Sequence, residues 1–105
     1  MKKIINGKRY DTEKAILVGE YHTAGIGHND FNYWEAALYK TPISGSFFLA
    51  GEGHGMTMFA SSNGNCRGWG SKLLPMSKAE ALQWAENYLE PDEIEEHFSD
   101  LIEEA

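Results

Sequence analysis

Cysteine is almost absent from this sequence, since Cys66 is the one cysteine among 105 residues. A single thiol excludes a disulfide framework within the chain and fits a reducing compartment. Long apolar runs are missing too. The longest aliphatic stretch, Ala15 to Val18, is far shorter than the roughly 20 residues of a membrane helix, and the N-terminal residues lack the apolar run of a secretory signal. We therefore expect a soluble, cytoplasmic protein with no membrane partner.

Catalytic signatures are also missing, so we predict a non-enzymatic protein without a cofactor. The four histidines and the cysteine show none of the close spacings that are typical of structural zinc sites, and we predict no metal site. One alternative remains open, a small metal-dependent protein whose ligands are His22, His28, His54 and Cys66. Stoichiometric zinc in the purified protein would favour that alternative.

The acidic residues are concentrated at one end of the chain. The composition, 42% hydrophobic and 24% charged, is that of one folded domain over residues 1–105. The net charge is −7, yet residues 86–105 hold 9 acidic residues and no Lys or Arg, whereas residues 1–85 hold 7 acidic and 9 basic residues. Direct nucleic-acid binding is disfavoured because it needs clustered Lys and Arg. The slight positive charge of residues 1–85 nevertheless leaves a nucleic-acid-binding regulatory protein as an alternative.

Residues 1–76 are predicted to be rich in strands. Asn6-Gly7, between two short β-prone runs, predicts a hairpin, because both central residues of a type I′ turn need a positive φ. Further strands are predicted over Ile16–Tyr21, Phe31–Thr41, Ser46–Ala50 and Ser71–Met76. Within the second of these, Glu35 to Leu38 also fits a helix.

Glycine is frequent in the middle of the chain, with six residues between Gly51 and Gly70. We predict a loop region here, with a short strand over Met56 to Ala60, because glycine is costly to order and marks special backbone geometry. The run Gly51 to Gly55 lacks the Gly-Lys-Ser/Thr ending of a phosphate-binding loop. The role of this region stays open.

Residues 77–105 are predicted to form two helices. Ser77 and Glu80 match a capping box at the start of the first helix, and Pro91 suits the first position of the second. The buried face of the second helix is predicted to contain Ile94, Phe98, Leu101 and Ile102. The predicted fold is therefore α+β, a three- to four-stranded antiparallel sheet followed by two C-terminal helices.

Four carboxylates in the acidic end recur every three to four residues. On a helix this spacing places side chains on one face, and the row is formed by Glu93, Glu96, Asp100 and Glu103. We predict a docking surface for a host protein with a basic, nucleic-acid-binding surface, which such a row would attract over distance. The alternative is an ordinary solvated helix face.

Two residues of the glycine-rich region are candidate anchors of the same interface. Trp and Arg dominate the energetics of protein interfaces, which selects Arg67 and Trp69. The many aromatic residues equally suit the interface of a homodimer.

Three stretches of the chain resemble a family of small proteins from phages and other mobile elements of Firmicutes. The first is Ile5 to Glu13, the second is EAALYK (Glu35 to Lys40) with FFLAGEG (Phe47 to Gly53), and the third is Leu74 to Ala81 with Trp84 to Glu86. That family is similar to anti-CRISPR inhibitors, small proteins that bind a host CRISPR nuclease or effector complex. The resemblance implies a stoichiometric inhibitor and identifies neither its target nor its functional residues.

Overall fold

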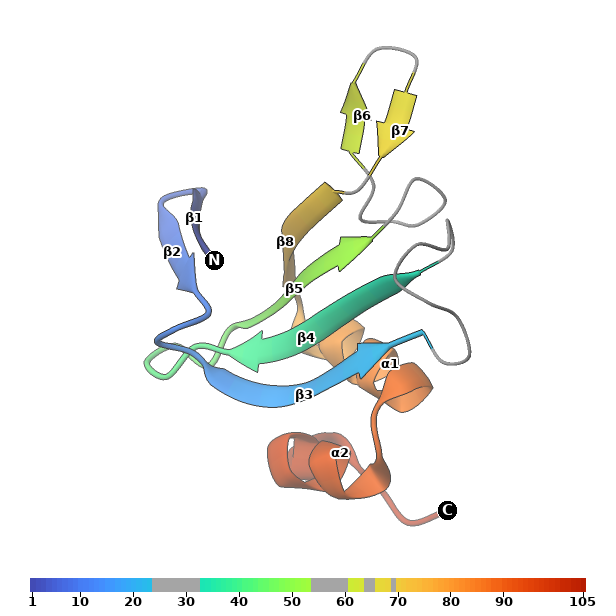
Figure 1. Ribbon diagram of the computed structural model, residues 1–105. Helices are drawn as coiled ribbons and strands as arrows, with labels where there is room; N and C mark the ends of the chain where they lie inside the picture. The colour runs from blue at the N-terminus through green and yellow to red at the C-terminus, as the bar shows by residue number, and fades with distance from the viewer. Residues whose placement is uncertain (24–32, 54–60, 64–65, 69) are drawn as a thin grey trace.

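The computed structural model describes residues 1–23, 33–53, 61–63, 66–68 and 70–105 (Figure 1). It confirms the α+β prediction, because a four-stranded antiparallel sheet is followed by two helices. The strands are β1 (Lys2–Ile5), β2 (Lys8–Asp11), β3 (Ile16–His22), β4 (Trp34–Lys40), β5 (Phe47–Gly53), β6 (Ser61–Asn63), β7 (Cys66–Gly68) and β8 (Gly70–Met76). The helices are α1 (Lys78–Tyr88), α2 (Pro91–Phe98) and the short 3-10 helix η1 (Ser99–Leu101).

The main sheet has the strand order β3-β4-β5-β8, and every neighbouring pair is antiparallel. Strand β4 pairs with β3 on one side and with β5 on the other, with Ala37 opposite both Glu20 and Ala50. This double pairing makes the segment Glu35 to Leu38 a strand rather than a helix. Three of the four strands are consecutive in the chain, so strands that are neighbours in sequence also pair in the sheet.

The N-terminal hairpin forms as predicted. Asn6 has φ 52° and Gly7 has φ 77°, the positive values that a type I′ turn requires. Among the described strands, β1 and β2 pair with each other alone and form a separate two-stranded sheet. After the hairpin, the Asp11 carboxylate accepts a hydrogen bond from the Glu13 backbone N–H at 3.0 Å, which stabilises the turn that leads into β3.

Helices α1 and α2 cover one face of the main sheet. Side chains alternate between the two faces of a strand, and Ala36, Leu38 and Leu49 point toward the helices. The helical side of this core includes Ala81, Trp84, Ala85, Leu89 and Phe98. None of the described helices is long and apolar enough to cross a membrane.

The hairpin covers part of the opposite face of the sheet. Tyr10 packs there with the buried Phe48 and Leu73, and its ring lies edge-on to that of Phe48 at a centroid distance of 5.4 Å. Tyr39 stacks on the same Phe48 ring at 5.3 Å. The sheet therefore separates two apolar clusters, and the larger one lies beneath the helices.

Both predicted helix starts are confirmed. Ser77 Oγ accepts a hydrogen bond from the Glu80 backbone N–H at 3.1 Å, and Glu80 accepts one from the Ser77 N–H at 2.9 Å. The hydrogen bond from the Ser77 backbone N–H, with a further one from the Ser77 side chain, holds the pKa of the Glu80 carboxyl below its usual value. Pro91 is the first residue of α2.

The predicted extent of the second helix is wrong. Helix α2 ends at Phe98, and Leu101 and Ile102 are exposed rather than buried. Phe98 is fully buried against the sheet and Ile94 is packed against the same core. The buried face of α2 therefore ends with Phe98, and the next residues form the 3-10 helix η1.

The predicted glycine-rich loop is partly a sheet. Strand β5 continues to Gly53, β6 pairs with β7 in a separate two-stranded sheet, and β8 begins at Gly70. The short strand predicted over Met56 to Ala60 lies outside the described residues.

Candidate functional site

The four carboxylates of the predicted row do not form one helical face. Glu93 and Glu96 lie on α2, whereas Asp100 lies in η1 and Glu103 follows it. Because α2 ends at Phe98, the three-to-four-residue spacing does not align Asp100 and Glu103 with the two glutamates on the helix.

Glu93 helps to stabilise the helix start rather than presenting a free carboxylate. It is half-buried, and its Oε1 accepts a hydrogen bond from the Glu90 backbone N–H at 3.3 Å. A carboxylate near a helix N-terminus also interacts favourably with the helix dipole. A change at Glu93 therefore disturbs α2 as well as the surface charge.

Asp100 is paired with a lysine of α1. Its carboxylate accepts a hydrogen bond from Lys78 Nζ, and this bond holds the pKa of Asp100 below its usual value, with a smaller contribution from the nearby Lys40. The pair joins residues 22 positions apart and connects η1 to the first turn of α1. Asp100 is thus already neutralised within the molecule.

We expect Lys78→Ala to raise the pKa of Asp100 toward its usual value. Because the folded-state pKa is lowered, the pair stabilises the protein above the unfolded pKa, and this contribution is lost as pH falls through the folded value. The variant should therefore lose less stability than the wild type as the pH falls through and below the usual pKa of an aspartate. An NMR titration of the Asp100 carboxyl and urea unfolding at several pH values measure both effects. Lys72→Ala is the matched control, and an unchanged Asp100 titration in Lys78→Ala would contradict the pairing.

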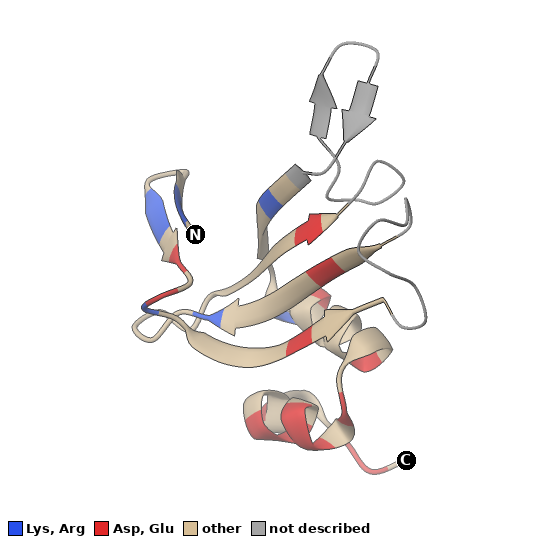
Figure 2. Ribbon diagram, in the orientation of Figure 1, with Lys and Arg blue, Asp and Glu red and all other residues tan. Residues whose placement is uncertain are grey.

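The exposed carboxylates of this end form a different set, which we call the acidic surface. Its members are exposed residues of α2 and of the segment after η1, namely Asp92, Glu95, Glu96, Glu103 and Glu104. Figure 2 shows acidic residues along α2 and the segment that follows it. Sequence reasoning missed Asp92 and Glu95 because it assumed a helix continuing past residue 98. Asp92 and Glu95 are three residues apart, and this spacing alone would have predicted that they share a helix face.

The acidic surface is held in place by aromatic packing. The Phe98 ring stacks on Phe47 of β5, with a centroid distance of 4.9 Å and an interplanar angle of 17°. Glu96 lies on the outer side of α2, where its side chain is 75% exposed and its Oε2 lies 3.9 Å from His97 Nε2. The carboxylates are thus presented on an anchored helix.

A second group of carboxylates lies on the open face of the sheet. Glu20, Glu35 and Glu52 come from β3, β4 and β5 and line a pocket of about 390 Å³. Glu35 and Glu52 are direct cross-strand neighbours, an arrangement that is unfavourable for like charges. Tyr33 donates a hydrogen bond to Glu35 Oε2 at 2.8 Å, and this bond raises the pKa of Tyr33. The sequence analysis did not identify this group, because strand register alone brings it together.

The remaining candidate residues are placed only in part. Arg67 lies in β7, and Trp69 falls outside the described residues. Of the proposed metal ligands, His22 is exposed at the end of β3, with its Nδ1 3.4 Å from the Thr23 carbonyl oxygen. His28 and His54 fall outside the described residues.

No group of three or more His, Cys, Asp or Glu side chains is placed to hold a metal ion within the described part of the chain. The metal-dependent alternative therefore has no described site. Comparisons with known proteins add no further constraint: no family model, curated protein or solved structure matches this chain.

Proposed function

We propose that this protein is a non-enzymatic inhibitor that binds a basic, nucleic-acid-binding surface of a host protein through its acidic surface. The observation behind the proposal is the group of exposed carboxylates on α2 and the segment after it, of which Asp92, Glu95 and Glu103 form no ion pair in the part of the chain described by the structure. Unpaired carboxylates attract a basic partner and accelerate association.

The anchored position of α2 supports this role. Phe98 is fully buried and Ile94 packs against the same core, so the helix presents its carboxylates without first having to fold. Preorganisation of this kind lowers the entropic cost of binding. A lysine- and arginine-lined groove that holds a phosphate backbone offers the complementary charge.

The resemblance to anti-CRISPR inhibitors makes a CRISPR nuclease or effector complex the first partner to test. In this proposal the protein acts stoichiometrically in the cytoplasm of a bacterial host, and it comes from a phage or another mobile element. Purified protein should retain such an effector in a pull-down at low salt and should reduce its cleavage of a target. Absence of binding to every effector of a broad panel would contradict the anti-CRISPR assignment.

Charge reversal at Glu95 and Glu96 tests the acidic surface directly. Both side chains are exposed and neither caps a helix, so Glu95→Lys/Glu96→Lys should fold normally. We expect the dissociation constant for the effector to rise at least about tenfold and its salt dependence to flatten. Isothermal titration calorimetry at two salt concentrations measures both changes.

The matched control reverses the charge of two glutamates outside the acidic surface. Glu13→Lys/Glu20→Lys alters two exposed residues outside the acidic surface and should bind the effector as the wild type does. An equal loss of affinity in both double variants would contradict the assignment, because net charge or the open sheet face would then determine binding.

A further inference from the structure

A pocket of about 380 Å³ lies between the β1–β2 hairpin and the turn that joins β4 to β5. Its apolar walls include Ala15, Pro42 and Ile43. Ile43 is 99% exposed, although burial of such a side chain is favourable by roughly 1.5–3 kcal/mol. Apolar residues gathered around one pocket, rather than scattered singly, are typical of an interaction site.

The same pocket has a positively charged rim. Lys8, Arg9 and Lys14 line it, and all three are exposed. The lining also includes Asp11, whose carboxylate accepts a hydrogen bond from the Glu13 backbone N–H in the turn after β2. The pocket therefore suits a segment that is both apolar and acidic.

The segment after α2 has this chemistry. Leu101 and Ile102 are 43% and 41% exposed, and they are followed directly by the exposed Glu103 and Glu104. Ile102 has φ −96° and ψ 130°, an extended conformation that lets neighbouring side chains point in opposite directions. Neither Leu101 nor Ile102 belongs to the core beneath the helices.

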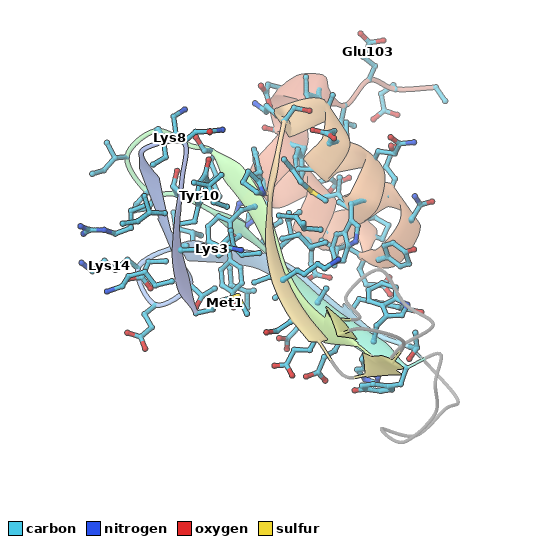
Figure 3. All side chains as sticks on the ribbon, turned by 90° about the horizontal axis from the view of Figure 1, so that it is seen from above. Met1, Lys3, Lys8, Tyr10, Lys14 and Glu103 are labelled. Atoms are coloured by element: carbon cyan, nitrogen blue, oxygen red, sulfur yellow. The ribbon has the colours of Figure 1, made fainter. Side chains whose placement is uncertain are left out.

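We propose that this segment of one copy docks into the hairpin pocket of a second copy of the chain. Leu101 and Ile102 would cover the apolar walls, and Glu103 and Glu104 would pair with the basic rim. In Figure 1 the C-terminus and the hairpin lie at opposite sides of the molecule, and in Figure 3 Glu103 is likewise far from Lys8 and Lys14. Because the segment and the pocket of one copy are apart, the contact joins two molecules.

Each copy contributes one segment and one pocket, so the contact closes into a reciprocal dimer or continues as an open chain. Glu103 and Glu104 belong to the acidic surface as well as to the docking segment, but only self-association also requires the pocket. A variant with a disrupted pocket should therefore still bind a CRISPR effector, which keeps the two proposals separable.

Sedimentation velocity of the full chain tests self-association. At about 0.01 M salt, where surface charges interact over about 30 Å, the wild type should change from monomer to larger species between about 10 µM and 1 mM protein. Added salt should reverse the change. A wild type that stays monomeric at about 1 mM overturns the proposal. Binding of the monomer to phosphatidylserine vesicles also overturns it, because the pocket would then be assigned to a membrane surface.

Complementary variants identify the two halves of the contact. Lys8→Glu/Lys14→Glu alters the pocket, and Leu101→Ser/Ile102→Ser alters the segment. Each variant alone should remain monomeric, and an equimolar mixture should form a one-to-one complex, because one intact pocket meets one intact segment. Lys72→Glu, a charge reversal of an exposed β8 lysine, should associate as the wild type does. A mixture that stays monomeric, or equal weakening by Lys72→Glu, contradicts the docking.

Discussion

Replacement of Phe98 by alanine is expected to lower the free energy of unfolding by roughly 3–5 kcal/mol. The Phe98 side chain is fully buried and its ring stacks on Phe47, so the substitution leaves a cavity where α2 meets the sheet. This is a large fraction of the stability of a small domain, roughly 5–15 kcal/mol. Urea unfolding followed by circular dichroism measures the loss.

Leu101→Ala is the matched control for Phe98→Ala. Leu101 is the next large apolar residue in the chain and is exposed, so its truncation should change stability by at most about 0.5 kcal/mol. Comparable losses for the two variants would mean that the buried face continues past α2, as the sequence pattern had predicted. The pair of variants therefore tests where the helix ends.

Gly19→Ala is expected to cost about 1–3 kcal/mol because it overpacks the contact between β3 and the helices. A Cβ atom at Gly19 would lie 2.6 Å from Glu93 Oε2 and 2.8 Å from both Cδ atoms of Leu89. The Glu93 carboxylate can move, whereas the Leu89 side chain is 9% exposed and packed in the core. The junction of α1 and α2 would therefore have to shift away from the strand.

A double-mutant cycle separates this steric effect from a change in β-strand propensity. In a Leu89→Ala background the clashing Cδ atoms are gone, so Gly19→Ala should add little further loss. Urea unfolding of the four proteins gives the coupling energy, which is expected to reach at least about 0.5 kcal/mol. Strict additivity of the two substitutions would contradict the close packing of Gly19 against Leu89.

Short-range sequence patterns were sufficient to predict turns and helix starts. The Asn6-Gly7 turn, the Ser77–Glu80 capping box and the position of Pro91 all depend on neighbouring residues and their backbone preferences. Such preferences act over three or four positions, so a single sequence contains them. The segregation of acidic residues to residues 86–105 is equally a property of the sequence.

Tertiary packing determined the remaining features. The sequence predicted a strand here and left a helix over Glu35 to Leu38 open, and pairing of both edges with β3 and β5 decides for the strand. Helix α2 ends at Phe98, whose ring stacks on Phe47, and Leu101 and Ile102 lie outside the core. Local spacing also allows a helix in both segments, and contacts with residues distant in sequence decide which structure forms.

The candidate site changed for the same reason. The sequence established that carboxylates gather at one end of the chain, but not which of them are exposed and unpaired. Lys78 pairs with Asp100, and the start of α2 engages Glu93. Glu95 and Glu96 stay exposed, and Glu95 forms no ion pair within the described residues. A carboxylate is available to a partner only if no cation or backbone N–H of its own fold reaches it, and that depends on contacts between residues far apart in sequence, which only the tertiary structure sets.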